Sequence, residues 1–313
     1  MIISASRRTD IPSYYSEWFF NRIREGSVMV RNPMNFRQVS KVKITPDVVD
    51  AVVLWTKNPL PVLDRLDELD GHTYYFQFTV TPYDKDIEPG LPPKGRILDA
   101  FRKLSDMIGK DRVIWRYDPI LINGKYTPEY HVRAFGDMAD VLCDHTRRVT
   151  ISFIDDGYRC VRSNIGKLAL SKLSEDMKAY VASRLAGIAH DRGLDIGICA
   201  EKNDMRDIGI GRAQCVDEHL ISELTGRRLI ATGDNNQRAE CRCASSIDIG
   251  MYNTCRNGCL YCYANYDQRT VILNSAEHDS LSPLISGCVG DDDIIIERRV
   301  RSYRDAQMRL DDL

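Results

Sequence analysis

Long apolar runs are absent from this chain of 313 residues. Since a helix needs about 20 consecutive apolar residues to cross a bilayer, we expect no membrane span and no membrane partner. Charge of one sign is also missing, because 43 Lys and Arg stand against 45 Asp and Glu, a net charge of −2. A chain so balanced has no general attraction for nucleic acid, which we therefore do not expect as a partner.

Flexible linkers and internal repeats are lacking too, since no stretch rich in Gly and Ser divides the chain. We therefore expect one continuous domain over residues 1–313, with cysteine clusters in 201–262 and a C-terminal tail over 287–313. The opening residues, MIISASRRTDIP, lack the basic stretch and apolar run of a secretion signal. The chain's ten cysteines are thus expected in a reducing cytoplasm, where clustered cysteines usually bind metal or take part in catalysis.

Short apolar runs alternate with amphipathic segments along the chain. Most runs are rich in Val, Ile and aromatic residues and lack clean polar alternation, as in parallel strands that are covered on both faces. We expect such strands at residues 1–5, 51–55, 74–81, 112–117, 148–154 and 194–200. Helical spacing predicts helices at 16–25, 61–69, 95–108, 130–143 and 174–192. This alternation predicts an α/β fold, either an open sheet or a barrel.

The C-terminal third of the chain is less regular. Residues 201–240 are rich in Gly, Asp and Asn, which predicts loops around one short helix near 216–225. A further strand is expected at 245–249. The tail after Gly287 contains three consecutive aspartates and ends in charged sequence, and we expect these charges on the solvated face of a helix.

Three cysteines, Cys255, Cys259 and Cys262, form a C-x3-C-x2-C motif in the run CRNGCLYCYAN. A [4Fe–4S] cube takes four thiolates, so three close cysteines can hold three irons and leave the fourth open to a small molecule. The alternatives are a structural zinc site and a set of buried free thiols. Zinc sites more often pair two C-x2-C units and use histidine, whereas the histidine nearest this loop is His278.

The CRNGCLYC run resembles the cluster motif of the radical S-adenosylmethionine (SAM) superfamily. The resemblance implies a [4Fe–4S] cluster held by the three cysteines, with SAM bound to the open iron. It also implies reductive cleavage of SAM to a 5′-deoxyadenosyl radical, supplied with electrons by a donor such as a ferredoxin or flavodoxin. The fold that it implies is a full or partial (β/α) barrel, with the cysteine motif on the loop after the first strand.

Two further stretches resemble the spore-photoproduct-lyase-like branch of that superfamily. LWTKNP at 54–59 is similar to a strand ending in T-K-[NS]-P, and the run from 87 to 104 is similar to a loop with an E-P dipeptide before a helix that an arginine opens. The residues concerned are Thr56, Lys57, Asn58, Pro59, Glu88, Pro89 and Arg96. The whole chain also resembles a bacterial family, domain of unknown function 1848, whose C-terminal end reads like SIDIGMYNTCRNGCLYCYAN.

The cysteine motif comes late in this chain, whereas in the superfamily it comes early. A circular permutation accounts for this departure. The strand at 245–249 would be strand one of the barrel, and the strands at 1–5, 51–55, 74–81, 112–117 and 148–154 would follow it in that order. Permutation is tolerated where the termini lie close together at the surface. The G-G-E segment of the superfamily, which grips the SAM amino group, is absent, and SASRRTDIP stands in its place.

Polar residues follow the predicted strands, and in a parallel barrel the functional groups gather at these carboxyl ends. Arginine and lysine could pair the SAM carboxylate, Asp10 could accept from its amine, and Tyr261 or Tyr263 could pack on its adenine. Each residue could instead form a structural ion pair or a cap. The candidate SAM-binding residues are Arg7, Arg8, Asp10, Lys57, Asn58, Arg116 and Tyr261.

A second group of cysteines precedes the C-x3-C-x2-C motif. Cys241 and Cys243 form a C-x-C pair, and Cys215 and Cys199 lie upstream. Four is the number of ligands in a fully ligated cluster, so these residues predict a second, auxiliary [4Fe–4S] cluster. The alternative for Cys199 is a place in the core, because free cysteine packs as a small hydrophobe.

Two functions from different classes fit these features. The leading hypothesis is a radical SAM enzyme of unknown substrate, in which the cofactor performs the chemistry and the barrel supplies orientation and a dry cavity. The alternative is a non-catalytic protein that binds an iron–sulfur cluster or zinc and does not bind SAM. Damaged DNA, the substrate that the lyase-like branch suggests, is disfavoured by the balanced charge.

Overall fold

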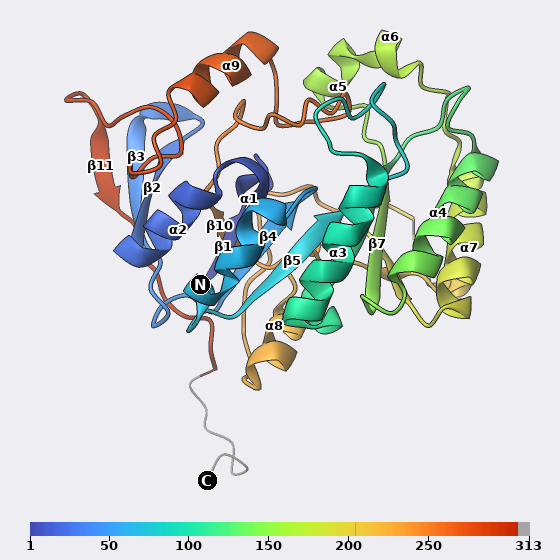
Figure 1. Ribbon diagram of the computed structural model, residues 1–313, viewed down its shortest axis with the longest axis horizontal. Helices are drawn as coiled ribbons and strands as arrows, with labels where there is room; N and C mark the ends of the chain where they lie inside the picture. The colour runs from blue at the N-terminus through green and yellow to red at the C-terminus, as the bar shows by residue number, and fades with distance from the viewer. Residues whose placement is uncertain (204, 306–313) are drawn as a thin grey trace.

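The computed structural model describes residues 1–203 and 205–305, and its centre is a sheet of eight strands (Figure 1). The strand order is β10-β1-β4-β5-β6-β7-β8-β9. All seven neighbouring pairs are parallel, which makes this an α/β fold. The strands are β1 (Ile2–Ala5), β4 (Ala51–Thr56), β5 (Tyr74–Thr79), β6 (Val113–Ile120), β7 (Arg148–Phe153), β8 (Asp195–Ile198), β9 (Gly211–Arg212) and β10 (Ser246–Asp248).

Strand β10 lies beside β1, although the two are far apart in the sequence, with Ile247 opposite Ile3. The sheet places β10, β1, β4, β5, β6 and β7 side by side in the order that was predicted for them, so the predicted strand order is confirmed. Strands β10 and β9 are the outermost strands of the sheet in the described part of the chain. The sheet is therefore open, and the described strands form no closed barrel.

Both faces of the sheet are covered, because successive side chains of a strand point to opposite sides. Ile3 and Val52 belong to the main core, which the larger helices complete. Their chain neighbours Ile2 and Val53 belong to a second core on the other face, which helix α8 (Glu218–Thr225) completes. Burial on both sides explains why these strands appear in the sequence as apolar runs without polar alternation.

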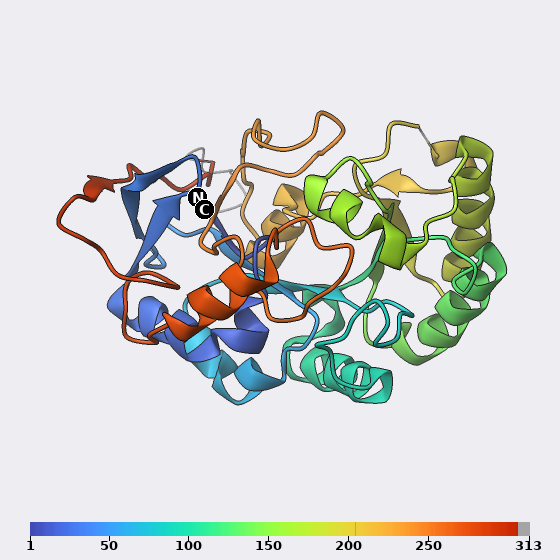
Figure 2. The same ribbon diagram turned by 90° about the horizontal axis from the view of Figure 1, so that it is seen from above.

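The main core packs against four α-helices and one long 3-10 segment, and Figures 1 and 2 show the helices arranged around the sheet. All five were predicted, and their bounds agree with the predicted ones within about two residues. The segment predicted as a helix at 61–69 is a 3-10 helix rather than an α-helix. The five are α2 (Ser16–Glu25), η1 (Leu60–Leu69), α3 (Lys94–Ile108), α4 (Pro128–Leu142) and α7 (Glu175–Asp191).

Local sequence explains where these helices begin and end. The side chain of Ser174 accepts a hydrogen bond from the backbone N–H of Met177 and so caps α7. Thr127 caps α4 in the same way, and Pro128 follows at the first helical position. Helix α2 ends at Gly26, which has a φ of 67°. A side chain there would be strained, and its Cβ would lie 2.7 Å from Thr45 Cγ2.

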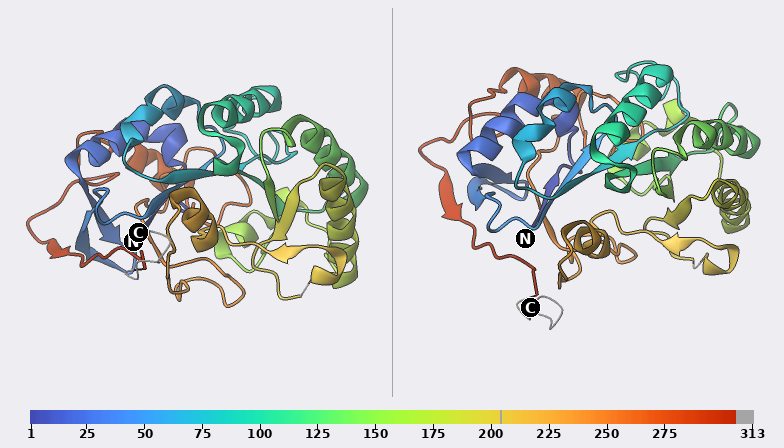
Figure 3. Two further views of the ribbon diagram at one scale, coloured as in Figure 1. Left: turned by 90° about the horizontal axis from the view of Figure 1, so that it is seen from below. Right: turned by 60° about the horizontal axis from the view of Figure 1, so that its bottom comes forward.

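A second, smaller sheet lies at one end of the molecule, and the sequence did not predict it (Figure 3). Strands β2 (Ser27–Asn32) and β3 (Asn35–Lys43) form an antiparallel hairpin, and β11 (Ile294–Glu297) pairs with β3 in parallel. The helix expected in the tail after Gly287 is therefore wrong for the described part, which holds β11 and no helix up to residue 305. Three consecutive isoleucines favour an extended strand there.

The remaining elements are short and connect the strands. None of the helices in residues 1–203 and 205–305 is long and apolar enough to cross a membrane. These short elements are α1 (Ile11–Tyr14), η2 (Lys110–Arg112), α5 (Arg159–Ser163), α6 (Ile165–Leu168), η3 (Arg206–Ile208) and α9 (Gln268–Ala276).

The contact between α3 and the sheet predicts a large stability effect at Phe101, which is fully buried and stacks on Phe78 with ring centroids 5.0 Å apart. Phe101→Ala should lower the free energy of unfolding by about 3–5 kcal/mol, because it removes buried apolar surface and leaves a cavity. Met107→Ala, on the exposed side of the same helix, should change it by less than about 0.5 kcal/mol. Urea titrations of both variants test this, and equal losses would contradict it.

Candidate functional site

The cysteine motif lies on the loop that follows β10, at the carboxyl edge of the sheet. Backbone hydrogen bonds join this loop to the segment after β5, from Gly90 N to Asn257 O (2.9 Å) and from Leu260 N to Ile87 O (3.0 Å). A Cβ on Gly90 would lie 2.5 Å from Asn257 O, so only glycine allows this close approach. From the other side, the hydroxyl of Tyr15 donates to Thr254 O at 2.6 Å.

The structure places Cys255, which is buried, and Cys259 and Cys262, which are half-buried, on one turn. The backbone N–H of Cys262 donates to Cys259 O at 3.0 Å, and all three cysteines are free thiols. Burial raises the pKa of each thiol to about 12, and the neighbouring thiols of the motif contribute to the shifts. Within the described ranges, no three Cys, His, Asp or Glu side chains stand arranged to hold a metal ion.

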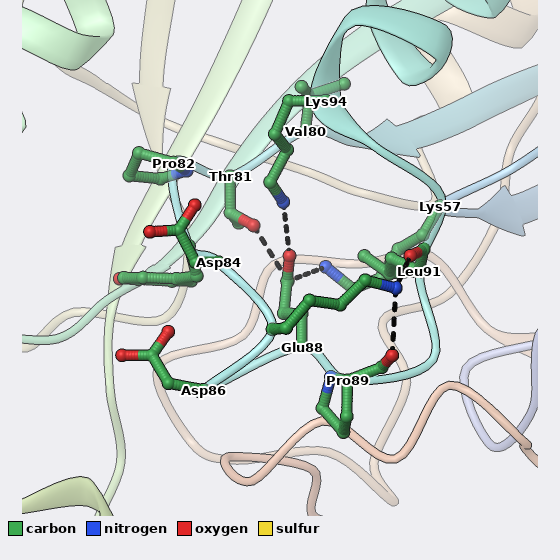
Figure 4. Close-up of polar contacts among 12 residues, drawn as sticks. Lys57, Val80, Thr81, Pro82, Asp84, Asp86, Glu88, Pro89, Leu91 and Lys94 are labelled. Carbon is green, nitrogen blue, oxygen red and sulfur yellow. Dashed lines mark hydrogen bonds and ion pairs between the residues drawn. The ribbon is translucent and has the colours of Figure 1, made fainter.

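A buried carboxylate, Glu88, lies beside this turn, and Figure 4 shows side chains from several elements directed at it. Lys57 Nζ lies 2.9 Å from Oε1, Lys94 Nζ lies 2.5 Å from Oε2, and Thr81 Oγ1 donates to Oε1 at 2.7 Å. The hydroxyl of Tyr261, from the cysteine loop, also donates to Oε1. Glu88 therefore links β4, β5, α3 and the cysteine loop.

The charges of this group are balanced. Burial alone would raise the pKa of Glu88, but Lys57 and Lys94 outweigh burial and lower it to about 2. Burial likewise acts to lower the pKa of Lys57. The charge of Glu88, and to a smaller extent that of Cys259, outweighs burial, so that the Lys57 pKa is raised. Lys57 is thus a cation at neutral pH that lies next to the cysteine turn.

Asp10, predicted to accept from the SAM amine, already has four donors from the chain itself. These are Thr56 Oγ1 (2.8 Å), Lys57 N (2.8 Å), Ser13 N (3.1 Å) and Asn257 Nδ2 (3.1 Å). Burial raises the pKa of this carboxyl, and the hydrogen bonds act against that shift. The structure thus places Asp10 as the cap of α1 and as a link between the end of β4 and the cysteine loop.

Arg7 and Arg8, two of the predicted SAM-binding residues, differ in how many hydrogen bonds their side chains make within the protein. The guanidinium of Arg7 donates to Ser246 Oγ at 2.7 Å and to Asp234 Oδ2 at 3.3 Å. Arg8 is less engaged, since its Nη1 donates to Gly250 O at 3.5 Å and its Nε lies 3.9 Å from Asp248 Oδ1. Arg8 thus retains the more available donors of the two.

Two further candidates also have internal partners. Arg116 donates from Nη1 to Cys215 Sγ at 2.7 Å and pairs with Asp118, so it belongs with the second cysteine group. Asn58 uses its side-chain oxygen to accept from Leu60 N at 3.4 Å in the turn after β4. The predicted candidates thus lie along the same edge of the sheet, and only part of the set contacts the cysteine turn.

The four upstream cysteines are brought together by the fold. Cys199 Sγ lies 3.6 Å from Cys215 Sγ, and the sulfur of Cys243 accepts from the backbone N–H groups of Cys215 (3.3 Å) and Val216 (3.5 Å). Hydrogen bonds from Cys215 and Cys241 lower the pKa of Cys243, against the effect of burial. Residues from three places in the sequence therefore form one group of thiols.

Sequence reasoning missed two residues that organise the site. Asp248 accepts from Ser6 Oγ (2.5 Å), Arg7 N (2.8 Å) and Gly250 N (3.0 Å), and so fixes the loops after β1 and β10. Its position as the polar end of a predicted strand was the available signal. Lys94 was missed because the motif drew attention to Arg96, which is exposed.

The Glu88 group predicts a pH-dependent contribution to stability. Glu88→Gln should lower the free energy of unfolding at neutral pH by roughly 3–5 kcal/mol, because two lysines lose their buried partner. The folded pKa of about 2 lies below the ordinary value of 4.5, so this contribution should be lost as the pH falls from 4.5 towards 2. Glu297→Gln, whose side chain is 83% exposed, is the control and should have little effect. Denaturant titrations over this pH range test the prediction, which equal stabilities of Glu88→Gln and wild type would contradict.

Comparison with known proteins identifies the family of this chain and little else. No curated protein matches the chain. A crystal structure from Bacteroides thetaiotaomicron described as "a putative alpha-L-fucosidase" is 14% identical, with a TM-score of 0.28, over 67% of this chain and 60% of that chain. This chain thus spans less than two thirds of that structure, and the low similarity carries no functional argument. The family described as "Domain of unknown function (DUF1848)" matches residues 2–264, and the chain belongs to this family.

Proposed function

We propose that this protein is a radical SAM enzyme that carries a [4Fe–4S] cluster on Cys255, Cys259 and Cys262. One observation carries the proposal. Lys57 and Glu88, which lie in the stretches that resemble the lyase-like branch, contact each other and the cysteine loop through Tyr261. Three distant parts of the sequence that resemble one superfamily thus meet at one edge of the sheet.

The residues of the cysteine turn fit such a cluster. A cube takes four thiolates, and three free thiols share one partly buried turn here. The charge of Lys57 lies beside Cys259 and would stabilise a thiolate there. The turn is held from both sides by hydrogen bonds that do not involve sulfur.

The order of the strands supports the permuted arrangement within this proposal. We interpret the open sheet as a partial barrel in which β10 acts as the first strand and β1 as the second. The nitrogen of Met1 donates to Arg301 O at 2.7 Å, so the first residue lies beside the last described segment. Neighbouring ends of this kind are what a permutation requires.

The bound cluster and SAM would together supply a 5′-deoxyadenosyl radical after one-electron reduction by a donor such as a ferredoxin or flavodoxin. The chain's own residues would bind and orient SAM. Arg8 has donors available for its carboxylate, and Lys57 keeps further N–H groups beyond its bond to Glu88. The hydroxyl of Tyr263 donates to Arg7 O, and the guanidinium of Arg8 lies over the ring of Tyr252. Both tyrosine rings could therefore line the adenine of SAM.

A second candidate function is a non-catalytic iron–sulfur or zinc protein. The observation that favours it is the engagement of the predicted SAM ligands by internal partners. Asp10 has four donors within the chain, and Arg7 and Arg116 each bind side chains of the protein. A protein of this kind would bind metal and would not bind or cleave SAM.

The proposal predicts that SAM cleavage depends on the cysteine turn. Protein loaded with iron and sulfide without oxygen, then reduced and given SAM, should form 5′-deoxyadenosine. Cys259→Ala should reduce this product to the background of a protein-free reaction, because one ligand of the cluster is lost. Cys288→Ala is the matched control, since Cys288 is exposed and outside both cysteine groups.

Chromatography of the quenched reaction measures the product. Continued formation of 5′-deoxyadenosine by Cys259→Ala would refute the assignment. Iron-loaded wild type that forms none would favour the non-catalytic alternative.

A further inference from the structure

The group formed by Cys199, Cys215, Cys241 and Cys243 lies on the face of the sheet that α8 covers. Cys199 directly follows β8, Cys215 comes soon after β9, and the C-x-C pair precedes β10. The chain therefore converges on this point from three places. All four residues are free thiols, and two of them, Cys215 and Cys243, are almost fully buried.

These sulfurs border the second core, and they also face cationic and N–H donors. A thiol is a weak acceptor, yet Cys215 Sγ accepts from the buried guanidinium of Arg116, and Cys243 Sγ accepts from two backbone N–H groups. Arg7 lies close enough to Cys243, and Arg238 to Cys199, for their charges to interact. The three guanidinium groups, of Arg7, Arg116 and Arg238, would offset the negative charge of a centre built from thiolates.

Two other roles for the group fit less well. Cysteines that only fill a core need no buried guanidinium, and the desolvation of Arg116 is costly without an anionic partner. Asp118 supplies one such partner, but Nη1 of Arg116 points to sulfur. A disulfide between Cys199 and Cys215 would leave the C-x-C pair unexplained, and the sulfurs stand 3.6 Å apart.

We infer that Cys199, Cys215, Cys241 and Cys243 form a second metal centre that takes a thiophilic metal through four thiolates. As the thiols stand, Cys199 contacts Cys215, and Cys243 contacts both Cys215 and Cys241. No three of them are placed around a single ion in the described chain, so metal entry requires loss of their protons and rotation of the side chains. The inference does not depend on SAM chemistry. Either zinc or an iron–sulfur cluster would satisfy four thiolates, and metal analysis separates the two.

Metal content of the full chain, prepared without oxygen and supplied with iron, sulfide and zinc, tests the inference. A variant with serine at positions 255, 259 and 262 removes the first site and leaves the four thiols untouched. It should retain about four irons with matching sulfide, or about one zinc, per chain. Cys241→Ser with Cys243→Ser should lose this metal and keep the first site's iron. Cys143→Ser with Cys288→Ser, the control variant, should keep the metal of both sites.

Each outcome decides the matter. No metal in the triple variant would overturn the second centre while leaving the proposed cluster intact. Wild-type metal content in the variant Cys241→Ser with Cys243→Ser would also overturn the second centre and leave the proposed cluster intact. A wild type that holds metal only through the four thiols would refute the proposed function and support this inference. Loss of two free thiols in metal-free protein purified without oxidant would indicate a disulfide instead.

A separate observation concerns strand β11 at the outer edge of the small sheet (Figures 1 and 3). Its three isoleucines, Ile294, Ile295 and Ile296, are 59%, 48% and 44% exposed. In the part of the chain that the structure describes, β11 pairs with β3 alone. An apolar edge strand with one open side is a template for pairing with another strand.

The flanks of β11 carry opposite charges that suit pairing with an identical strand. Asp291 and Asp292 precede it, Arg298 and Arg299 follow it, and all four are exposed. The N–H of Arg298 faces β3, where it donates to Lys41 O at 2.9 Å. Since alternate residues of a strand face alternate sides, the polar backbone groups of residue 295 face outward.

We propose that β11 pairs with β11 of a second copy of this chain, antiparallel and centred on Ile295. In this register the backbone of Ile295 exchanges two hydrogen bonds with its symmetry mate, as in an antiparallel hydrogen-bonded pair. Residues 291 and 292 of each copy then face residues 299 and 298 of the other, so that acidic and basic flanks meet. Asp293 faces Glu297 in this register, and their charges are met within each copy by Arg31 and Lys41. The two small sheets join into one continuous sheet across a two-fold axis.

Charge exchange tests this dimer by sedimentation velocity over a range of protein concentrations. Wild type should sediment as a dimer at high concentration. Asp291→Arg with Asp292→Arg should be a monomer, as should Arg298→Asp with Arg299→Asp, because like charges then face each other. An equimolar mixture of the two variants should restore the dimer. A monomeric wild type, or a mixture that forms no complex, would overturn the proposal.

Discussion

The buried carboxylate of Glu88 is the interaction on which the arrangement of the site depends. A buried charge is costly unless other charges and donors compensate it. Here the compensation comes from Lys57 after β4, Thr81 after β5, Lys94 at the start of α3 and Tyr261 in the cysteine loop. If any of these elements shifted, part of the compensation would be lost. The requirement to neutralise one carboxylate therefore holds the cysteine loop against the sheet.

Two other carboxylates act in the same way along this edge. Asp248 collects donors from the loops after β1 and β10, and Asp10 collects donors from the end of β4 and from Asn257. Each binds segments that are distant in sequence and adjacent only because β10 pairs with β1. Many of the polar side chains at the strand ends thus form hydrogen bonds that position the loops. Arg8, with fewer internal partners, is the residue left most available to a ligand.

The sequence predicted the main sheet well and the small sheet not at all. The strands of the main sheet are covered on both faces, so their apolar runs stand out from the sequence around them. Strands β2 and β3 are only partly buried and mix polar and apolar residues, which gave no such signal. Three consecutive isoleucines do indicate a strand at β11, but the charged residues around them led to the prediction of a helix. The roles of Asp10 and Arg116 could not be predicted, because their partners lie at long sequence separation. The motif at 255–262 could be recognised because its spacing is a local property of the sequence, whereas the second group was predicted from the number of cysteines that remain upstream.

The two cysteine groups differ in what they require of the fold. The motif at 255–262 needs only one turn, so its ligands stay close together even where the surrounding structure loosens. The group at 199, 215, 241 and 243 exists only once β8, β9 and the loop before β10 have assembled. Strand β9 has two residues, which alone contribute little pairing energy. A metal bound by these four thiolates would bind the folded state more tightly than the unfolded chain, and by mass action it would stabilise this weak edge of the sheet.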